Sequence, residues 1–245
     1  AGQLHLEYQP IVDIRTGRPV KAEALLRWEH PTLGRVSPAV FIPLAEKYGI
    51  IRKLSRWVLR QALADLARWT SLFGMHFQVS INRSSHDFDD YEECHTEMRE
   101  ALHEFGLCGE NLIVEITEHS LVGSTTVTEK ILKAYQALGV QVAMDDFGTG
   151  YSSLDYLKRY PVNYLKIDKS FVDTLEYSSV EYQLCDGIIS IARRLGLEVV
   201  AEGVENATQV EILRSLGAGF IQGYHYARPM RAAALEAFMA AAGPE

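Results

Sequence analysis

Cysteine is scarce in this chain, and the cysteines present lack the spacing of a structural site. Three of them, Cys94, Cys108 and Cys185, occur in 245 residues, and none forms a Cys-x-x-Cys pair. This odd number and wide spacing argue against a disulfide framework and against a structural zinc site. We therefore expect this domain to lie in a reducing compartment, the cytoplasm.

Long apolar runs and an excess of positive charge are also absent. No segment approaches the roughly 20 consecutive apolar residues that span a membrane, so we expect no direct membrane contact by this domain. The formal net charge is -8, with 24 Lys and Arg against 32 Asp and Glu. Binding to duplex DNA or RNA depends on clustered basic residues, so a general nucleic-acid binder is disfavoured. An acidic chain that handles phosphate groups needs bound cations.

The composition favours one large α/β domain. Hydrophobic residues make up 47% of the chain, which is enough for a substantial core. No linker, low-complexity run or internal repeat divides the sequence, so we expect a single domain over residues 1–245. Because the chain begins Ala1-Gly2 and not with methionine, we expect it to be part of a longer protein. A sensor, a cyclase domain or a membrane anchor elsewhere in that protein stays open.

Eight short apolar segments, rich in β-branched residues, alternate with longer segments whose apolar residues recur at helical spacing. The predicted strands cover residues 4–9, 20–27, 77–82, 112–117, 141–145, 164–167, 198–202 and 220–222. One predicted helical face lies between the second and third strands and consists of Ile51, Leu54, Trp57, Val58, Ala62, Leu66 and Trp69. This alternation is typical of repeated βα units.

Two further features specify the fold. Several predicted helices are followed directly by a glycine, the residue that most easily takes the left-handed conformation that ends a helix: Gly106, Gly139, Gly196 and Gly217. Only residues 13–17 join the first two strands, which is too short for a helical crossover, so these strands are expected to be antiparallel. The predicted fold is a TIM-like (β/α)8 barrel with the first strand antiparallel.

Most of the predicted strands end on a carboxylate, amide or ammonium group. These residues are Glu23, Asn82, Glu115, Asp145, Asp146, Lys166, Asp168, Glu202 and Gln222. In a parallel barrel the carboxyl ends of the strands meet on one rim, where barrel enzymes carry their chemistry. Carboxylates this close repel one another unless metal or protons neutralise them, and we expect metal. Carboxylate and amide oxygens without His or Cys suit Mg²⁺ or Mn²⁺.

The adjacent Asp145 and Asp146 predict a pair of ions, an arrangement common in phosphodiester hydrolysis. Lys166 then supplies a fixed cation beside the attacking water, and Glu202 supplies a general base. Simpler interpretations stay open for each residue alone. A glutamate that ends a strand is more often solvated, the segment 145–150 is also compatible with an ordinary strand-to-helix turn, and Lys166 could pair with Asp168.

The sequence resembles the EAL-domain cyclic di-GMP phosphodiesterases. The triplet Glu23-Ala24-Leu25 is the signature of that family, but three residues alone carry little weight. The resemblance extends in order along nearly the whole chain, through Gln9-Pro10-Ile11, Ser80-Ile81-Asn82, Glu115-Ile116-Thr117-Glu118, Asp145 to Ser153, Lys166-Ile167-Asp168, Ala201 to Glu205, and Gln222-Gly223-Tyr224. This ordered set is highly specific.

The resemblance implies hydrolysis of cyclic di-GMP to linear 5′-pGpG with two Mg²⁺ or Mn²⁺ ions. It implies that one ion is held by Glu23, Asn82, Glu115 and Asp145, and the second by Asp145 and Asp146. It assigns the attacking water to Lys166 and Glu202, and leaves open which of them is the base. It assigns substrate contacts to Gln9, Arg27, Glu205 and Gln222. It further implies a homodimer whose contacts are coupled to the metals by Glu118, Phe147, Gly148, Thr149 and Gly150.

Two segments depart from the family pattern. Arg83 stands where an apolar residue is common, and His225-Tyr226-Ala227 replaces an apolar and small-residue stretch. Neither touches an expected ligand, so they bear on affinity and regulation more than on chemistry. Two other functions stay open: a catalytically silent module that senses cyclic di-GMP, and a scaffold that only contacts other proteins. Every expected ligand is present, which favours the enzyme.

Overall fold

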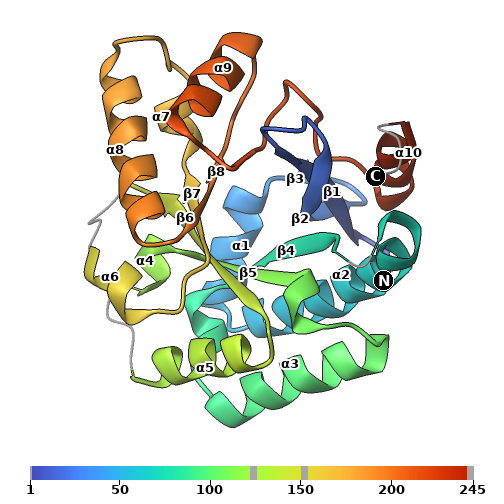
Figure 1. Cartoon of the computed structure of the whole chain (residues 1–245). Helices are drawn as coiled ribbons and strands as arrows, with labels where there is room; N and C mark the ends of the chain where they lie inside the picture. The colour runs from blue at the N-terminus through green and yellow to red at the C-terminus, as the bar shows by residue number, and fades with distance from the viewer. Residues whose placement is uncertain (1, 75, 122–125, 150–153, 242–245) are drawn as a thin grey trace.

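The computed structural model describes residues 2–74, 76–121, 126–149 and 154–241. Within these residues, nine strands form one sheet. In chain order they are β1 (Leu4–Asp13), β2 (Pro19–His30), β3 (Gly34–Val36), β4 (Gln78–Asn82), β5 (Leu112–Thr117), β6 (Gln141–Phe147), β7 (Tyr164–Ile167), β8 (Glu198–Ala201) and β9 (Phe220–Ile221). Figure 1 shows the sheet at the centre of the molecule, with the helices around it.

The sheet closes on itself through β1. This strand is antiparallel both to β2 and to β9. The other strands of the ring pair in parallel in the order β2, β4, β5, β6, β7, β8 and β9. Eight strands therefore complete the ring, which confirms the predicted TIM-like barrel with an antiparallel first strand. The short β3 was not predicted, and it adds only an antiparallel hairpin to the end of β2.

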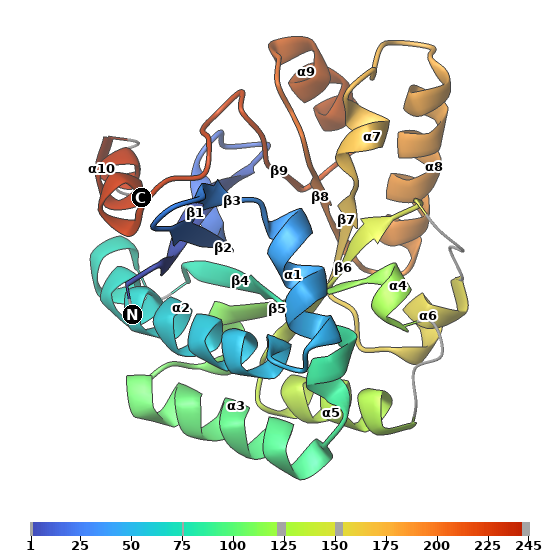
Figure 2. The ribbon, with the colours of Figure 1, turned by 180° about the vertical axis from the view of Figure 1, so that it is seen from behind.

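The helices cover the outside of the barrel, as Figures 1 and 2 show from front and back. Gly106 and Gly217 end their helices in the left-handed conformation, and Gly139 and Gly196 follow theirs with positive φ, so the predicted helix ends are confirmed. The helices are α1 (Pro38–Lys47), α2 (Ile51–Phe73), α3 (Tyr91–Phe105), α4 (Glu118–Leu121), α5 (Thr126–Ala137), α6 (Leu154–Arg159), α7 (Lys169–Val172), α8 (Val180–Arg194), α9 (Ala207–Leu216) and α10 (Ala232–Ala241).

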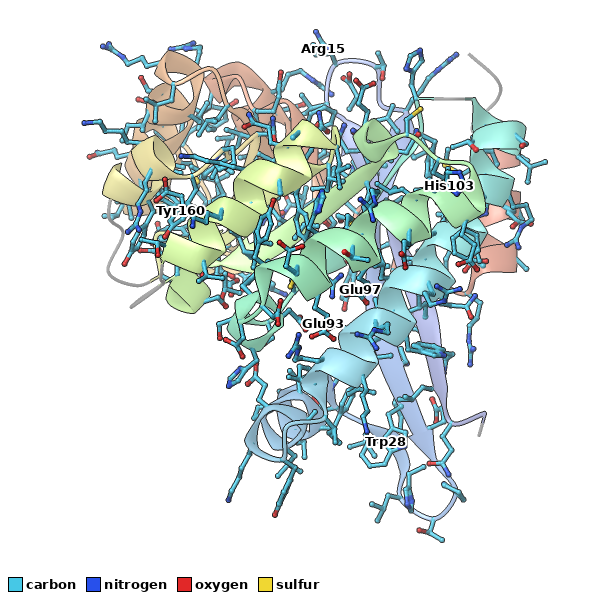
Figure 3. The ribbon with its side chains drawn as sticks, turned by 90° about the horizontal axis from the view of Figure 1, so that it is seen from below. Arg15, Trp28, Glu93, Glu97, His103 and Tyr160 are labelled. Atoms are coloured by element: carbon cyan, nitrogen blue, oxygen red, sulfur yellow. The ribbon has the colours of Figure 1, made fainter. Side chains whose placement is uncertain are left out.

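The predicted apolar face of α2 packs on the barrel, and its polar face meets α3. Seen from below in Figure 3, Glu93 and Glu97 of α3 lie at the seam with α2. There Arg56 pairs with Glu93 at 2.7 Å and with Glu97 at 3.1 Å. Among the helices of the described residues, none combines the length and the hydrophobicity that a membrane span requires.

A network of polar contacts, buried at Tyr8 and Asp65, joins β1 to α2 and α10. The Tyr8 hydroxyl donates a hydrogen bond of 2.6 Å to Asp65, and Arg68 pairs with both Asp65 and Glu236. The Trp69 indole donates to the same Glu236 at 2.9 Å. These polar contacts hold Tyr8 in place, and Tyr8 directly precedes Gln9 in β1. They therefore fix the strand that also contributes to the functional site.

The substitution Tyr8→Phe is expected to destabilise the protein by about 1.5–3 kcal/mol, because the charged Asp65 carboxylate loses the buried hydrogen bond that the Tyr8 hydroxyl donates. Urea denaturation checks this through a lower midpoint with an unchanged slope. Tyr48→Phe is the matched control, since Tyr48 is 71% exposed, and its midpoint should equal that of the wild type. Equal midpoints for both variants would show that the buried bond contributes nothing.

Candidate functional site

The barrel interior is layered, and the layering places the polar side chains. A small apolar cluster of Ile11, Ile113, Ala143, Tyr164 and Val200, with Phe220 packed against it, fills the middle of the ring. Side chains of a strand alternate between its two faces, so the residue two positions further toward the open end also points inward. Those residues are Gln9, Glu115, Asp145, Lys166, Glu202 and Gln222. Alternation along six strands thus brings six polar groups to one rim.

Lys166 lies at the centre of this rim. Its Nζ is 2.6 Å from a Glu202 oxygen, 2.8 Å from Glu115, 3.2 Å from Asp145 and 3.6 Å from Glu23. Only 2% of its side chain is exposed. Lys166 does not pair with Asp168, which instead caps α7 by accepting hydrogen bonds from the backbone and hydroxyl of Ser170. That alternative interpretation is therefore wrong.

Amide side chains hold the carboxylate of Glu23. Asn82 donates to one Glu23 oxygen at 2.8 Å, and Gln222 donates to the other at 2.8 Å. Gln222 also contacts the Gln9 oxygen at 3.0 Å, and Gln9 in turn donates to the backbone oxygen of Ala227. Asn82, predicted as a ligand, and Gln222, predicted as a substrate contact, thus both hold the glutamate of the signature triplet, and Gln9 is joined to it through Gln222.

Asp145 and Asp146 both reach the rim because the strand is irregular there. In a regular strand adjacent side chains point to opposite faces, but the pairing of β6 with β7 shifts register between Met144 and Phe147. Asp146 has a φ of 54°, a left-handed conformation that is uncommon for a residue other than glycine. In consequence, oxygen atoms of Asp145, Asp146 and Glu202 lie within 4.8 Å of one another.

Burial and mutual repulsion perturb these groups strongly. Burial, together with Glu23, raises the pKa of Glu115 well above its usual value, and burial raises the pKa of Glu202 to about 8. Burial and the adjacent Asp145 raise the pKa of Asp146. Burial acts to lower the pKa of Lys166, but the surrounding carboxylates hold it well above its usual value. Lys166 therefore stays an ammonium ion and is the one local counter-charge among these residues.

The donor set fits hard divalent cations. Five carboxylates, from Glu23, Glu115, Asp145, Asp146 and Glu202, face a single ammonium, so the rim keeps an excess of negative charge. All candidate ligand atoms are oxygens, which Mg²⁺ and Mn²⁺ prefer. Opposite charge placed here would also lower the raised pKa values, because it stabilises the ionised carboxylates.

A cavity of about 280 Å³ opens beside the acidic rim. Its lining comprises Gln9, Glu23, Leu25, Asp145, Lys169, Glu202, Gly203, Glu205, Gln222, Gly223 and Tyr224. Sequence reasoning missed Lys169, which has no motif of its own, and treated Tyr224 only as a family landmark. Glu205 lines the cavity as expected. Arg27 does not line it: its guanidinium pairs with Glu7 at 2.7 Å and borders a neighbouring groove together with Asn82.

The residues expected to couple the metals to dimer contacts lie next to the rim. Glu118 is buried at the start of α4, directly after β5, and Phe147 is buried at the end of β6. Gly148 has a φ of 98°, and the hydroxyl of Thr149 donates to the backbone oxygen of Asp146 at 2.9 Å. Gly150 lies outside the described residues.

Comparison with known proteins places this architecture in a family. The model of the EAL domain matches residues 1–229. The chain is 41% identical over 239 residues to the cyclic di-GMP phosphodiesterase NbdA of Pseudomonas aeruginosa, covering 98% of this chain and 30% of that protein. It is 40% identical over 243 residues to the oxygen sensor protein DosP of Escherichia coli, covering 99% of this chain and 30% of that protein.

A solved structure agrees with these matches. The MucR phosphodiesterase of Pseudomonas aeruginosa, in complex with c-di-GMP, has a TM-score of 0.89 and 40% identity, covering 95% of this chain and 94% of that chain. The chain spans about a third of the length of the curated relatives it matches. The barrel with one reversed strand, the acidic rim and these matches agree, and the chain belongs to the EAL domain family.

Proposed function

We propose that this domain hydrolyses one phosphodiester bond of cyclic di-GMP to give linear 5′-pGpG, with two divalent ions, Mg²⁺ or Mn²⁺. One observation carries the proposal: Lys166 lies among Glu23, Glu115, Asp145 and Glu202 at the open end of the barrel. Relatives of 40–41% identity are named as cyclic di-GMP phosphodiesterases. A catalytically silent sensor would have no need to retain this complete set of groups.

The expected ligand set divides between two ions. Glu23, Asn82, Glu115 and Asp145 would hold the first, and Asp145 with Asp146 would hold the second. When bound, such ions activate a water molecule and stabilise the attacking and leaving oxygens of the phosphodiester. The bulge in β6 supports the assignment, because it turns two successive carboxylates toward one place.

Lys166 and Glu202 are the groups assigned to the reaction itself. The Lys166 ammonium orients the attacking water by donating a hydrogen bond and stabilises negative charge that develops on the phosphate. The Glu202 carboxylate accepts a proton from that water; bound cations keep it ionised for this role, because they stabilise the charged form of a carboxylate whose pKa burial raises in their absence. Gln9, Gln222 and Glu205 orient the dinucleotide from the cavity wall, and Arg27, which pairs with Glu7 beside the neighbouring groove, is the remaining assigned contact.

Substitution of either group is expected to lower turnover more than substrate binding. Lys166→Ala and Glu202→Gln should each reduce kcat by about 10²- to 10⁴-fold, with the Kd for cyclic di-GMP changed far less, because both groups act mainly in the transition state. Chromatography of the linear product gives kcat, and calorimetric titration gives Kd. Glu211→Gln, an exposed surface change, is the control. A near-normal kcat in Lys166→Ala or Glu202→Gln would contradict the role assigned to the substituted residue. Binding of cyclic di-GMP by the wild type without any linear product would favour the catalytically silent sensor module.

Metal binding is expected to release protons. Burial raises the pKa of Glu202 to about 8, so this group is protonated at neutral pH in the metal-free protein and must lose its proton as a cation binds, and the pKa values of Glu115 and Asp146 are shifted in the same direction. Affinity for Mn²⁺ should therefore rise as the pH rises toward about 8 and level off above it. Titration calorimetry in two buffers of different ionisation enthalpy measures the released protons directly. Affinity that is independent of pH would contradict this assignment of the protonated groups.

We further propose that the domain is a cytoplasmic homodimer. Glu118 directly follows β5 and Phe147 ends β6, and these strands pair through Thr117 and Asp145, so both residues are buried beside the expected metal ligands. The three cysteines form no disulfide, which agrees with a reducing compartment. Sedimentation of the purified domain is expected to give twice the mass of the chain at micromolar concentration. A single-chain mass across that range would contradict the dimer.

A further inference from the structure

The ring of Phe171 packs directly against the backbone of Gly148. A Cβ atom built on Gly148 would lie 2.9 Å from Cζ and 3.0 Å from Cε2 of this ring, and 3.6 Å from Cδ1 of Ile188. The ring therefore fills the volume that any side chain at position 148 would need. Gly148 also has a φ of 98°, which residues with a side chain rarely adopt.

Two elements fix the position of Phe171. Its backbone N–H donates to the Asp168 oxygen at 3.1 Å, within the short α7 that follows β7, the strand of Lys166. Its backbone oxygen accepts a weak hydrogen bond from Sγ of Cys185 in α8 at 3.8 Å. Figures 1 and 2 show α7 beside α8. The ring is thus held relative to Lys166 independently of the segment that it contacts.

Gly148 belongs to the turn that begins at Asp146. The backbone N–H and the hydroxyl of Thr149 both donate to the Asp146 oxygen, at 3.3 and 2.9 Å, and close a four-residue turn over 146–149. Glycine stands third in this turn, the position at which a type II turn requires a positive φ. Asp146 also lies in the bulge of β6, where the register with β7 shifts. The strained aspartate and the glycine under the ring are therefore parts of one short segment.

We infer that Phe171 is a positioning residue for Asp146 and acts through Gly148. The ring holds the turn against the segment that follows β7. It thereby stabilises the φ of 54° that turns the Asp146 carboxylate toward Asp145 and Glu202. Without the ring the turn can relax, and Asp146 returns to the alternation of a regular strand, in which neighbouring side chains point to opposite faces. The inference rests on the proposed function, which makes Asp146 a ligand of the second ion.

A positioning role and a packing role predict different results for the two ions. Phe171 is partly buried against the main hydrophobic cluster, so its loss also removes some apolar packing. General loosening of the barrel would weaken both ion sites alike. Loss of the turn conformation would weaken only the second site, because the first takes Asp145 but not Asp146.

The test counts ions in Phe171→Leu, a variant that stays apolar but lacks the ring atoms that contact Gly148. Calorimetric titration with Mn²⁺ is expected to give two sites in the wild type. In Phe171→Leu the first site should keep its Kd, and the second should weaken by about 5- to 150-fold, which corresponds to the cost of one strained backbone conformation. Phe105→Leu is the matched control, since Phe105 of α3 is also partly buried against the main cluster and contacts Arg60 of α2.

A measurement on metal-free protein needs no bound ion and no activity. The three-bond coupling between the amide and α protons of Asp146 depends on φ, and nuclear magnetic resonance measures it. Phe171→Leu is expected to shift this coupling to the value of an extended strand, and Phe105→Leu should leave it unchanged. If the wild type binds fewer than two ions, the proposed function fails, and this coupling still decides the role of Phe171.

Gly148→Ala tests the same contact from the other side. In the wild type the new methyl group meets the ring, whereas in Phe171→Leu that collision is absent. The two substitutions should therefore be non-additive in the Kd of the second ion, while the strain from φ is the same in both backgrounds. Additive effects overturn the inference. So do two ion sites of wild-type affinity in Phe171→Leu, equal weakening of both sites, or an unchanged coupling at Asp146.

Discussion

The structure depends on one interaction, the burial of a single ammonium among four carboxylates. Glu23, Glu115, Asp145 and Glu202 come from different parts of the ring and would repel one another without the Lys166 cation between them. Removing one partner from a buried charged group is strongly unfavourable, so the strands that carry these residues must stay in register. The same excess of negative charge that Lys166 only partly neutralises makes the rim suitable for divalent cations.

The fold follows from features that are local in sequence. Alternating apolar segments, glycines after helices and the short first connection define the barrel without knowledge of distant contacts. Boundaries are less accurate where local chemistry and tertiary pairing disagree. The first strand was predicted to end at Gln9, yet pairing with β2 continues it to Asp13, although Pro10 lacks a backbone donor. The three-residue β3 is too short to show any periodicity.

Site residues were predictable where a polar group interrupts a buried strand, as for Glu115 and Lys166. Partners set by strand register were not predictable, since nothing in the sequence places Glu7 beside Arg27. The bulge at Asp146 was also hidden, because two adjacent aspartates equally fit an ordinary turn. Its left-handed backbone costs on the order of 1–3 kcal/mol, a strain that the surrounding barrel must stabilise. An exposed lysine such as Lys169 carries no pattern at all.

The ends of β7 and β8 and the segments that follow them carry two ion pairs at the same sequence spacing. Lys166 and Glu202 pair at 2.6 Å, and three positions later Lys169 and Glu205 pair at 3.1 Å. β7 and β8 are parallel and adjacent, which brings Lys166 and Glu202 together, whereas Lys169 at the start of α7 and Glu205 before α9 lie beyond the paired strands and are positioned by the two helix starts. The inner pair is buried in the acidic rim, where the proposed reaction places the phosphate. The outer pair is half exposed on the wall of the cavity. Burial alone thus distinguishes two pairs of the same chemistry: the inner pair holds a charge among the carboxylates, and the outer pair stays accessible to solvent.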